Sequence, residues 1–474
     1  MLHGLIHSAR PAARWPSLPG PTQQRRKLLT LAIETSCDDT CVAILSRSCR
    51  HGVPGPDGPQ RAQLHFHEKI TARNTGHGGI HPIEALDSHR SSLAKLIDKS
   101  LRHLPVTSAA TNNGENILTT DGDVKQKPDF ISVTRGPGMR SNLSCGLDTA
   151  KGLATAWQIP MVGVHHMQAH TLTPRLVHAM AQKDESISTS ENDTRLKPAF
   201  PFLTLLISGG HTMLVHSHSL LQHSILASTL DVAIGDTLDK CGRIILPDSI
   251  KSTTTDTAYG KYLSRYAFAT PASFADWPIP SRRSDETDKP PNKYGWALQS
   301  PLSQTRDLAF SFAGIASRIS SLMTTRSSSP TDDERLLLAR SALGVSFEHL
   351  ASRTVIALEA LRSSGTAIPT LVVSGGVAAN DFLRWFLRET LDARGFGHVD
   401  LVFPPVELCT DNAAMIAWAG LEMFEAGYTT DVGCNAIRKW SMDSTSADGG
   451  ILGVGGWKKK VCRKGDLDSG EGEL

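Results

Sequence analysis

The sequence lacks any long hydrophobic run: no uninterrupted apolar stretch in its 474 residues approaches the roughly 20 residues that a membrane-spanning helix needs. Charged residues make up only 20% of the chain and the formal net charge is +2 at pH 7, so nucleic-acid binding would require a local basic patch. The eight cysteines form no Cys-x-x-Cys pair and no zinc-finger spacing. These absences exclude a disulfide mini-protein and predict reduced thiols and no membrane partner.

The first 30 residues contain five Arg and Lys residues and no acid, and the first acid of the chain is Glu34. This segment also lacks the apolar run of roughly 7–15 residues that marks a secretory signal. We therefore predict a mitochondrial transit peptide over residues 1–28 and a location in the mitochondrial matrix. An ordinary basic terminus is the alternative.

Two segments, 29–45 and 202–215, repeat one plan: an apolar strand, a polar turn and a second strand. Each is followed by further strands that end in glycine turns and lead into helices. Such units favour an α/β fold with ligands at the carboxyl ends of the strands. We predict a duplicated, two-lobe α/β fold of the actin-like ATPase type, with a cleft between the lobes.

The predicted N-terminal lobe spans residues 29–197 and is completed by about 405–442. The C-terminal lobe spans residues 198–404, and residues 443–474 form a flexible tail. Stretches rich in Ser, Thr, Pro, Gly or Asp bury little apolar surface and are predicted as surface insertions. They lie at 50–63, 105–127, 181–197, 248–298 and 323–334.

Two glycine turns, 208–210 and 374–376, directly follow apolar strands. In turns of this kind, backbone N–H groups can approach a phosphate without obstruction from side chains. A single Gly-Gly turn is usually only a turn. Two of them in duplicated lobes, together with the acidic and hydroxyl-bearing turn 34–40, favour a nucleotide whose phosphate is held between the lobes.

His166 and His170 are four residues apart, which on a helix directs both imidazoles to one face. Asp411, at the start of a later helix, offers a third ligand, although an N-cap is its simpler role. Two histidines and one carboxylate suit a catalytic Zn²⁺ or Fe²⁺ with open coordination positions. The alternative is a pair of surface or capping histidines. A zinc protease is disfavoured because Met167 occupies the place of the general-base Glu in the His-Glu-x-x-His motif.

Eight motifs follow one another between residues 29 and 442. They are Glu34-Thr-Ser-Cys-Asp-Asp-Thr40, Gly79-Ile-His-Pro82 with His89, Arg135-Gly-Pro-Gly138, the His166/His170 block, Ile207-Ser-Gly-Gly-His211, Asp236 through Lys240, Ser374-Gly-Gly-Val-Ala-Ala-Asn380 and Cys409-Thr-Asp-Asn412. In these motifs and their order the chain resembles the universal tRNA threonylcarbamoyladenosine transferase family, once called O-sialoglycoprotein endopeptidase, and most of all its mitochondrial branch.

The resemblance implies transfer of a threonylcarbamoyl group from L-threonylcarbamoyl-adenylate to N6 of adenosine 37 in ANN-decoding tRNAs, with release of AMP. It implies one divalent cation per subunit on His166, His170 and Asp411. It also implies tRNA and a separate adenylate-forming enzyme as partners, and a homodimer. The implied adenylate contacts are Leu206, Ile207, Ser208, Gly209, Gly210, Asp239, Gly260 and Asn380.

Two positions depart from the family pattern. The Tyr-Pro-Gly-Gly-Pro turn of the family is reduced here to Tyr259-Gly260, and a family lysine is replaced by Ala316. Two other classes remain open: an actin-like ATPase, which would not need the metal ligands, and a non-catalytic scaffold paralogue, which would be expected to lose the histidine pair.

Overall fold

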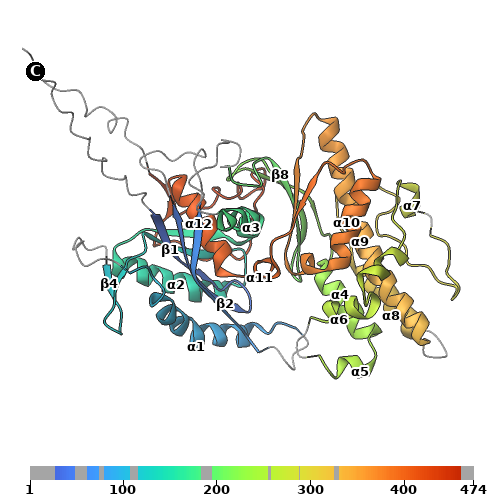
Figure 1. Ribbon diagram of the computed structural model, residues 1–474, viewed down its shortest axis with the longest axis horizontal. Helices are drawn as coiled ribbons and strands as arrows, with labels where there is room; N and C mark the ends of the chain where they lie inside the picture. The colour runs from blue at the N-terminus through green and yellow to red at the C-terminus, as the bar shows by residue number, and fades with distance from the viewer. Residues whose placement is uncertain are drawn as a thin grey trace, which may run out of the picture.

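The structure is a computed structural model that describes residues 27–48, 61–73, 79–106, 116–182, 195–254, 258–287, 289–324 and 330–460. Of the predicted transit peptide, residues 1–26 lie outside the described residues. Within these ranges, no helix is both long and apolar enough to cross a membrane. The elements form two halves, each built on one mixed β-sheet (Figure 1).

The first sheet has seven strands in the order β14-β13-β7-β6-β1-β2-β3. Their bounds are β1 Lys27–Glu34, β2 Asp39–Ser48, β3 Ala62–Thr71, β6 Phe130–Gly136, β7 Met161–His165, β13 Tyr428–Thr430 and β14 Trp457–Lys459. Side chains alternate between the two faces of β1: Leu31 packs with helices α1 (Pro82–Leu101) and α2 (Arg140–Trp157), whereas Ala32 packs with α3 (His166–Ala181) and α12 (Ala413–Glu425). Helices therefore cover both faces.

The second sheet has five strands in the order β10-β9-β8-β11-β12. Their bounds are β8 Phe202–Ile207, β9 Thr212–Ser217, β10 His223–Ser228, β11 Thr370–Ser374 and β12 Asp400–Val402. The accompanying helices are α4 Ile234–Ile245, α5 Asp248–Lys251, α6 Tyr259–Ala267, α7 Ser284–Thr287, α8 Ala313–Thr324, α9 Asp332–Ser363, α10 Asp381–Ala393 and α11 Val406–Cys409, with 3₁₀ turns η2 Pro271–Asp276 and η3 Gly376–Ala379. A small separate sheet pairs β4 (Asn116–Leu118) with β5 (Val124–Gln126).

The two sheets share one topology. In the first, β1 pairs antiparallel with β2, β2 antiparallel with β3, β1 parallel with β6, and β6 parallel with β7. In the second, β8 pairs antiparallel with β9, β9 antiparallel with β10, β8 parallel with β11, and β11 parallel with β12. This strand-for-strand repetition confirms the predicted duplicated α/β fold of the actin-like type.

Helices α3 and α12 lie between the two sheets. One apolar cluster joins Met415 and Trp418 of α12 to Phe202 and Leu206 of β8, and it also contains Ala32 of β1. Trp418 is completely buried there. The first residues of α3 and the segment before α12 are therefore held between the halves by apolar packing.

The prediction of a surface insertion over 248–298 is wrong for its described residues. Leu263, Phe268, Phe274 and Trp296 are buried in the core of the second half. The segment is mostly polar, but these few large apolar residues pack against α9 and α10, which offsets the cost of ordering the chain between them. The hairpin β4/β5 occupies part of the insertion predicted at 105–127.

The predicted flexible tail also differs from the structure over residues 443–460. Strand β14 pairs antiparallel with β13 and adds an edge strand to the first sheet. Ile451 is buried in the cluster between the sheets, and the indole N–H of Trp457 donates to its carbonyl at 2.9 Å. Residues 461–474 lie outside the described residues.

Candidate active site

The candidate metal ligands begin at the junction between β7 and α3. The buried strand β7 ends at His165, whose Nδ1 accepts a hydrogen bond from the N–H of Gln168 at 3.3 Å and so caps the helix. His166 is the first helical residue, and His170 follows one turn later on the same face. The strand end and the cap thereby fix where the histidine pair points.

His166, His170 and Asp411 converge as predicted. The Nε2 atoms of the two histidines lie 3.4 and 3.1 Å from one carboxylate oxygen of Asp411. The N-cap alternative for Asp411 is wrong, because the side chain of Asn412 accepts the hydrogen bond from the N–H of Met415 at 2.9 Å and caps α12. The carboxylate of Asp411 is left to face the histidines.

The donor set fits a divalent cation. One ligand atom from each of the three residues lies within 4.8 Å of the other two. A tetrahedral ion at about 2.1 Å from its ligands separates them by roughly 3.4 Å, close to the two spacings above. Two imidazoles and one carboxylate leave coordination positions open for a substrate.

Glu34 and Ser36 form a second layer behind His166. Glu34 is completely buried at the end of β1, and its Oε2 lies 3.4 Å from Nδ1 of His166. The hydroxyl oxygen of Ser36 lies 3.2 Å from the same nitrogen, and Thr134 donates a hydrogen bond to Glu34. A carboxylate on the far nitrogen of a ligating histidine fixes the ring and increases its basicity. Sequence reasoning assigned Glu34 to a phosphate-binding turn and missed this role.

The electrostatics of these groups are dominated by one cationic histidine. Burial works to lower the pKa of His166, but the carboxylates of Asp411 and Glu34 outweigh it and raise that pKa to about 10. Burial likewise works to raise the pKa of Asp411, and the charge on His166 holds it well below its usual value. A proton therefore occupies the centre in the absence of a metal, and a divalent cation would replace it.

The two glycine turns lie together at one edge of the second sheet. Leu206 of β8 is paired in register with Ser374 of β11, so both parallel strands end at the same level. Gly375 has a φ of +100°, and a Cβ at that position would be only 2.4 Å from the carbonyl oxygen of Ile207. Glycine is required there, because a side chain would collide with the backbone of β8.

The predicted contacts at the first turn differ in what they can offer a ligand. Leu206 and Ile207 are buried, which leaves only their backbone atoms available. Gly209 and Gly210 are exposed, and nothing lies within 4 Å of a Cβ built on either. The hydroxyl of Ser208 accepts from the N–H of Gly210 at 3.3 Å, which shapes the turn.

The remaining predicted contacts lie on α4, α6 and α10. The N–H of Gly260, in the first turn of α6, donates to Oδ1 of Asp239 on α4 at 2.7 Å, so the structure brings these two residues together. Asn380 is the N-cap of α10, and its side chain accepts from the N–H of Leu383 at 3.2 Å. The N–H of Gly235, at the start of α4, donates to the carbonyl of Ser208 at 3.1 Å and links α4 to the glycine turn.

The glycine turns adjoin the metal ligands. A Cβ on Gly376 would lie 3.9 Å from the methyl group of Thr410, the residue before Asp411. His211, which ends the first turn, is half-buried, and its desolvation together with the charges on His166 and His170 lowers its pKa to about 4. The candidate metal centre and the glycine turns thus form one continuous site between the two sheets.

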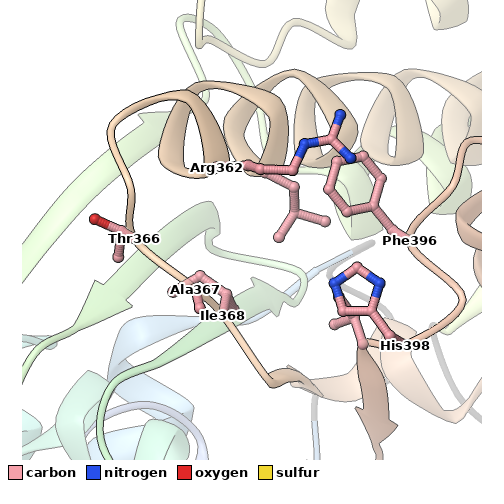
Figure 2. A pocket seen from close by; sticks show the side chains of 8 residues that line it. Arg362, Thr366, Ala367, Ile368, Phe396 and His398 are labelled. Carbon is pink, nitrogen blue, oxygen red and sulfur yellow. The ribbon is translucent and has the colours of Figure 1, made fainter.

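A separate small pocket of about 110 Å³ lies in the second half, where α9 ends and β12 begins. Figure 2 shows the guanidinium of Arg362 beside the ring of Phe396, and 4.6 Å separates its central carbon from the ring centre. None of the predicted site residues lines this pocket. The chemistry described above belongs to the site between the sheets.

Comparison with known proteins agrees with this geometry. Residues 65–418 match the family of tRNA N6-adenosine threonylcarbamoyltransferases, and the matched span contains the three candidate metal ligands and all the predicted adenylate contacts. The chain belongs to this family. The resemblance stated from the eight motifs is therefore confirmed, and the site lies in a family of transferases that act on tRNA.

Three relatives support the assignment. The mitochondrial tRNA N6-adenosine threonylcarbamoyltransferase of Schizosaccharomyces pombe is 34% identical over 93% of this chain and 91% of its own length. The mitochondrial protein of Danio rerio is 29% identical over 89% of this chain and 90% of its own length. The protein of Cereibacter sphaeroides strain KD131 is 30% identical over 89% of this chain and 96% of its own length.

Proposed function

We propose that this protein transfers the threonylcarbamoyl group of L-threonylcarbamoyl-adenylate to N6 of adenosine 37 in ANN-decoding tRNAs. The observation that carries the proposal is the convergence of His166, His170 and Asp411 beside the glycine turns, all within the span matched by the family. An actin-like ATPase has no need of this ligand set, and a scaffold paralogue has no reason to keep it.

The reaction is an acyl transfer to an amine. The N6 nitrogen attacks the carbamoyl carbon, a C–N bond forms, and the bond from that carbon to the phosphate oxygen breaks. The phosphate oxygen leaves with the electron pair as part of AMP, and the N6 proton passes to solvent or to a base. Because AMP is a competent leaving group, positioning and charge stabilisation supply most of what the protein must add.

The first half of the protein supplies the charged part of the site. A bound Zn²⁺ or Fe²⁺ would provide Lewis acidity that polarises an oxygen of the threonylcarbamoyl group. His166, His170 and Asp411 would hold it, and Glu34 orients the ring of His166. Burial of the histidines keeps water away from this side of the site.

The second half supplies the nucleotide part. The exposed turn of Gly209 and Gly210 leaves room for a phosphate at the backbone, and the start of α4 lies against it, where the helix dipole favours negative charge. Asp239 would accept hydrogen bonds from ribose hydroxyls, with Gly260 beside it. Asn380, at the start of α10, would offer its side-chain amide to the adenylate.

We further propose that the protein works in the mitochondrial matrix as a homodimer. The location is supported by the two mitochondrial relatives and by the basic, acid-free start of the chain. A reporter fused to residues 1–40 should enter mitochondria, and a uniformly cytosolic reporter would contradict the location. Light scattering of an active sample should give twice the chain mass, and an active monomer would contradict the dimer.

The function is tested with the purified, metal-loaded full chain, synthetic threonylcarbamoyl-adenylate and an ANN-decoding tRNA transcript. Mass analysis of the nucleosides should show threonylcarbamoyladenosine and an equal amount of AMP. A transcript with guanosine at position 37 is the matched control and should give no product. A folded, metal-loaded protein that forms no product from the adenylate would overturn the proposal.

A further inference from the structure

A pocket of about 350 Å³ lies where the start of α3, the start of β9 and residues 438–442 come together. His165 and Met167, which line it, flank the ligand His166 in the chain. His211 also lines it and lies close enough to His166 and His170 for their charges to act on it. Its volume is near the lower end of the range of about 300–1,000 Å³ for pockets that bind small ligands.

The lining of this pocket includes thioether and aromatic side chains. Met167 and Met213 contribute thioethers, which are polarisable and make favourable contacts with aromatic rings. Trp440 contributes a buried indole, which is fixed because its N–H donates to the carbonyl of Gly450 at 3.0 Å. Rigid aromatic and thioether surfaces of this kind suit a flat heterocycle such as a nucleobase.

Two exposed basic residues line the pocket, together with the half-buried acid Asp448. The basic residues are Arg438 and Lys439, and neither makes an ion pair among the described residues. The chain as a whole is almost neutral, so this pair is the kind of local patch that contact with a nucleic-acid backbone would require. Both residues lie beyond the span 65–418 matched by the family.

We propose that this pocket receives the base of the acceptor adenosine, and that Arg438 and Lys439 hold the phosphates on either side of that nucleotide. The inference rests on the proposed function. A base must leave the stack of the anticodon loop to present its N6 amine, and aromatic surfaces with basic side chains are the usual means of holding such a base. His165, which precedes the ligand His166 in the chain, and His211, which follows the first glycine turn, both line the pocket and would place the base near the metal centre.

The AMP half of the adenylate is a less suitable occupant. Its phosphate has the glycine turns and the start of α4 available, where backbone N–H groups can meet it. The pocket lining instead presents thioethers, an indole, two cations and the carboxylate of Asp448. The acceptor base and the donor would therefore approach the metal centre from two different sides.

The test measures the KM for an anticodon stem–loop RNA and, separately, the Kd for a non-hydrolysable adenylate analogue. The first variant is Arg438→Ala combined with Lys439→Ala, which changes only exposed side chains. The second is Met213→Trp, which fills the pocket from a half-buried position. Arg318→Ala is the control, since Arg318 is exposed on the distant helix α8 (Figure 1).

We expect both pocket variants to raise the KM for RNA by roughly 5-fold to 100-fold, the range that follows from losing one stacked base or its phosphate contacts. The Kd for the adenylate analogue and the melting temperature should stay as in the unmodified protein, and the control should match it throughout. An RNA carrying 8-azidoadenosine at the acceptor position should crosslink to the peptide containing Trp440 or to that containing His211.

Three outcomes would overturn the inference while leaving the proposed function intact. The unmodified protein forms product, but both variants keep its KM for RNA. Alternatively, the variants raise the Kd for the adenylate analogue and leave the KM for RNA unchanged, in which case the pocket holds the donor. Finally, the crosslink maps to peptides outside the pocket. If the unmodified protein forms no product, the proposed function fails, and the crosslink alone still reports where the base binds.

Discussion

Metal binding at His166, His170 and Asp411 should release a proton, and this provides the sharpest test of the site. Because the pKa of His166 is raised to about 10, its ring is protonated at neutral pH. The ion must displace that proton, and three pH units of competition at pH 7 cost about 4 kcal/mol. Apparent affinity should therefore rise roughly tenfold for each pH unit between pH 6 and 9. The carboxyl of Asp411 contributes no such dependence, because its pKa lies well below this range.

Titration calorimetry of the full chain with Zn²⁺, in buffers that differ in ionisation enthalpy, measures both affinity and proton release. We expect about one proton released per ion at pH 7. His170→Ala removes a ligand and should abolish retention of the ion through gel filtration, with loss of transfer activity and a folded circular dichroism spectrum. Glu34→Gln removes only the carboxylate behind His166 and should lower the affinity for the ion by about 10–100-fold.

His178→Ala is the matched control, because His178 lies on the same helix α3 two turns beyond His170 and is only half-buried. It should bind the ion with unchanged affinity and proton release. The reasoning would be refuted by an affinity that does not change between pH 6 and 9. It would equally be refuted by a folded His170→Ala protein that holds the ion as tightly as the control.

Three further predictions concern other parts of the molecule. Burial, partly opposed by Lys289, raises the pKa of Glu348 from 4.5 to about 7, so its contribution to stability is present below pH 4.5 and is lost as the pH rises towards 7. The unfolding free energy from urea titrations should fall by up to about 3 kcal/mol over this interval, and Glu348→Gln should flatten the profile. Gly375→Ala should cost about 1–3 kcal/mol of stability in the same assay and weaken adenylate binding, because the new Cβ meets the carbonyl of Ile207; unchanged stability would contradict this. Asn380→Ala should cost about 1 kcal/mol through the lost cap, whereas Asn380→Ser should keep the stability and still lose adenylate affinity; a Ser variant with full affinity would reduce Asn380 to a cap.

The sequence was sufficient for the fold because the inner strands of both sheets, β1, β6, β8 and β11, are buried on both faces over most of their length and are rich in apolar residues. The hairpins predicted at 29–45 and 202–215 appear as β1/β2 and β8/β9. Local composition gave a wrong prediction where a few buried side chains hold a mostly polar segment in the core. Phe268, Phe274 and Trp296 are too sparse in 248–298 to mark it as core, and only their distant partners reveal it.

The metal ligands were predictable in part. The spacing of His166 and His170 on one helix is a local signal. Asp411 was proposed as the third ligand from its place at a helix start, and the family resemblance implied the same residue, but no local signal links it to His170, from which 241 residues separate it. The second layer was missed for the same reason. Nothing near Glu34 in the sequence indicates that its carboxylate lies behind His166, since this contact exists only once β1 and β7 lie in one sheet.

The duplication itself explains why the site draws on both ends of the chain. Strand β7 is the last parallel strand of the first sheet's repeated unit, and β12 is its counterpart in the second. The histidine pair follows β7 directly, and Asp411 follows β12 and the short helix α11. Helices α3 and α12, which come after these two strands, pack against each other between the sheets. The segment that carries Asp411 therefore runs from the second sheet to α12, and a metal held by His166, His170 and Asp411 would fix this connecting segment to α3. Binding of the metal should accordingly raise the melting temperature of the whole protein in a single transition, and a rise confined to one half would contradict this arrangement.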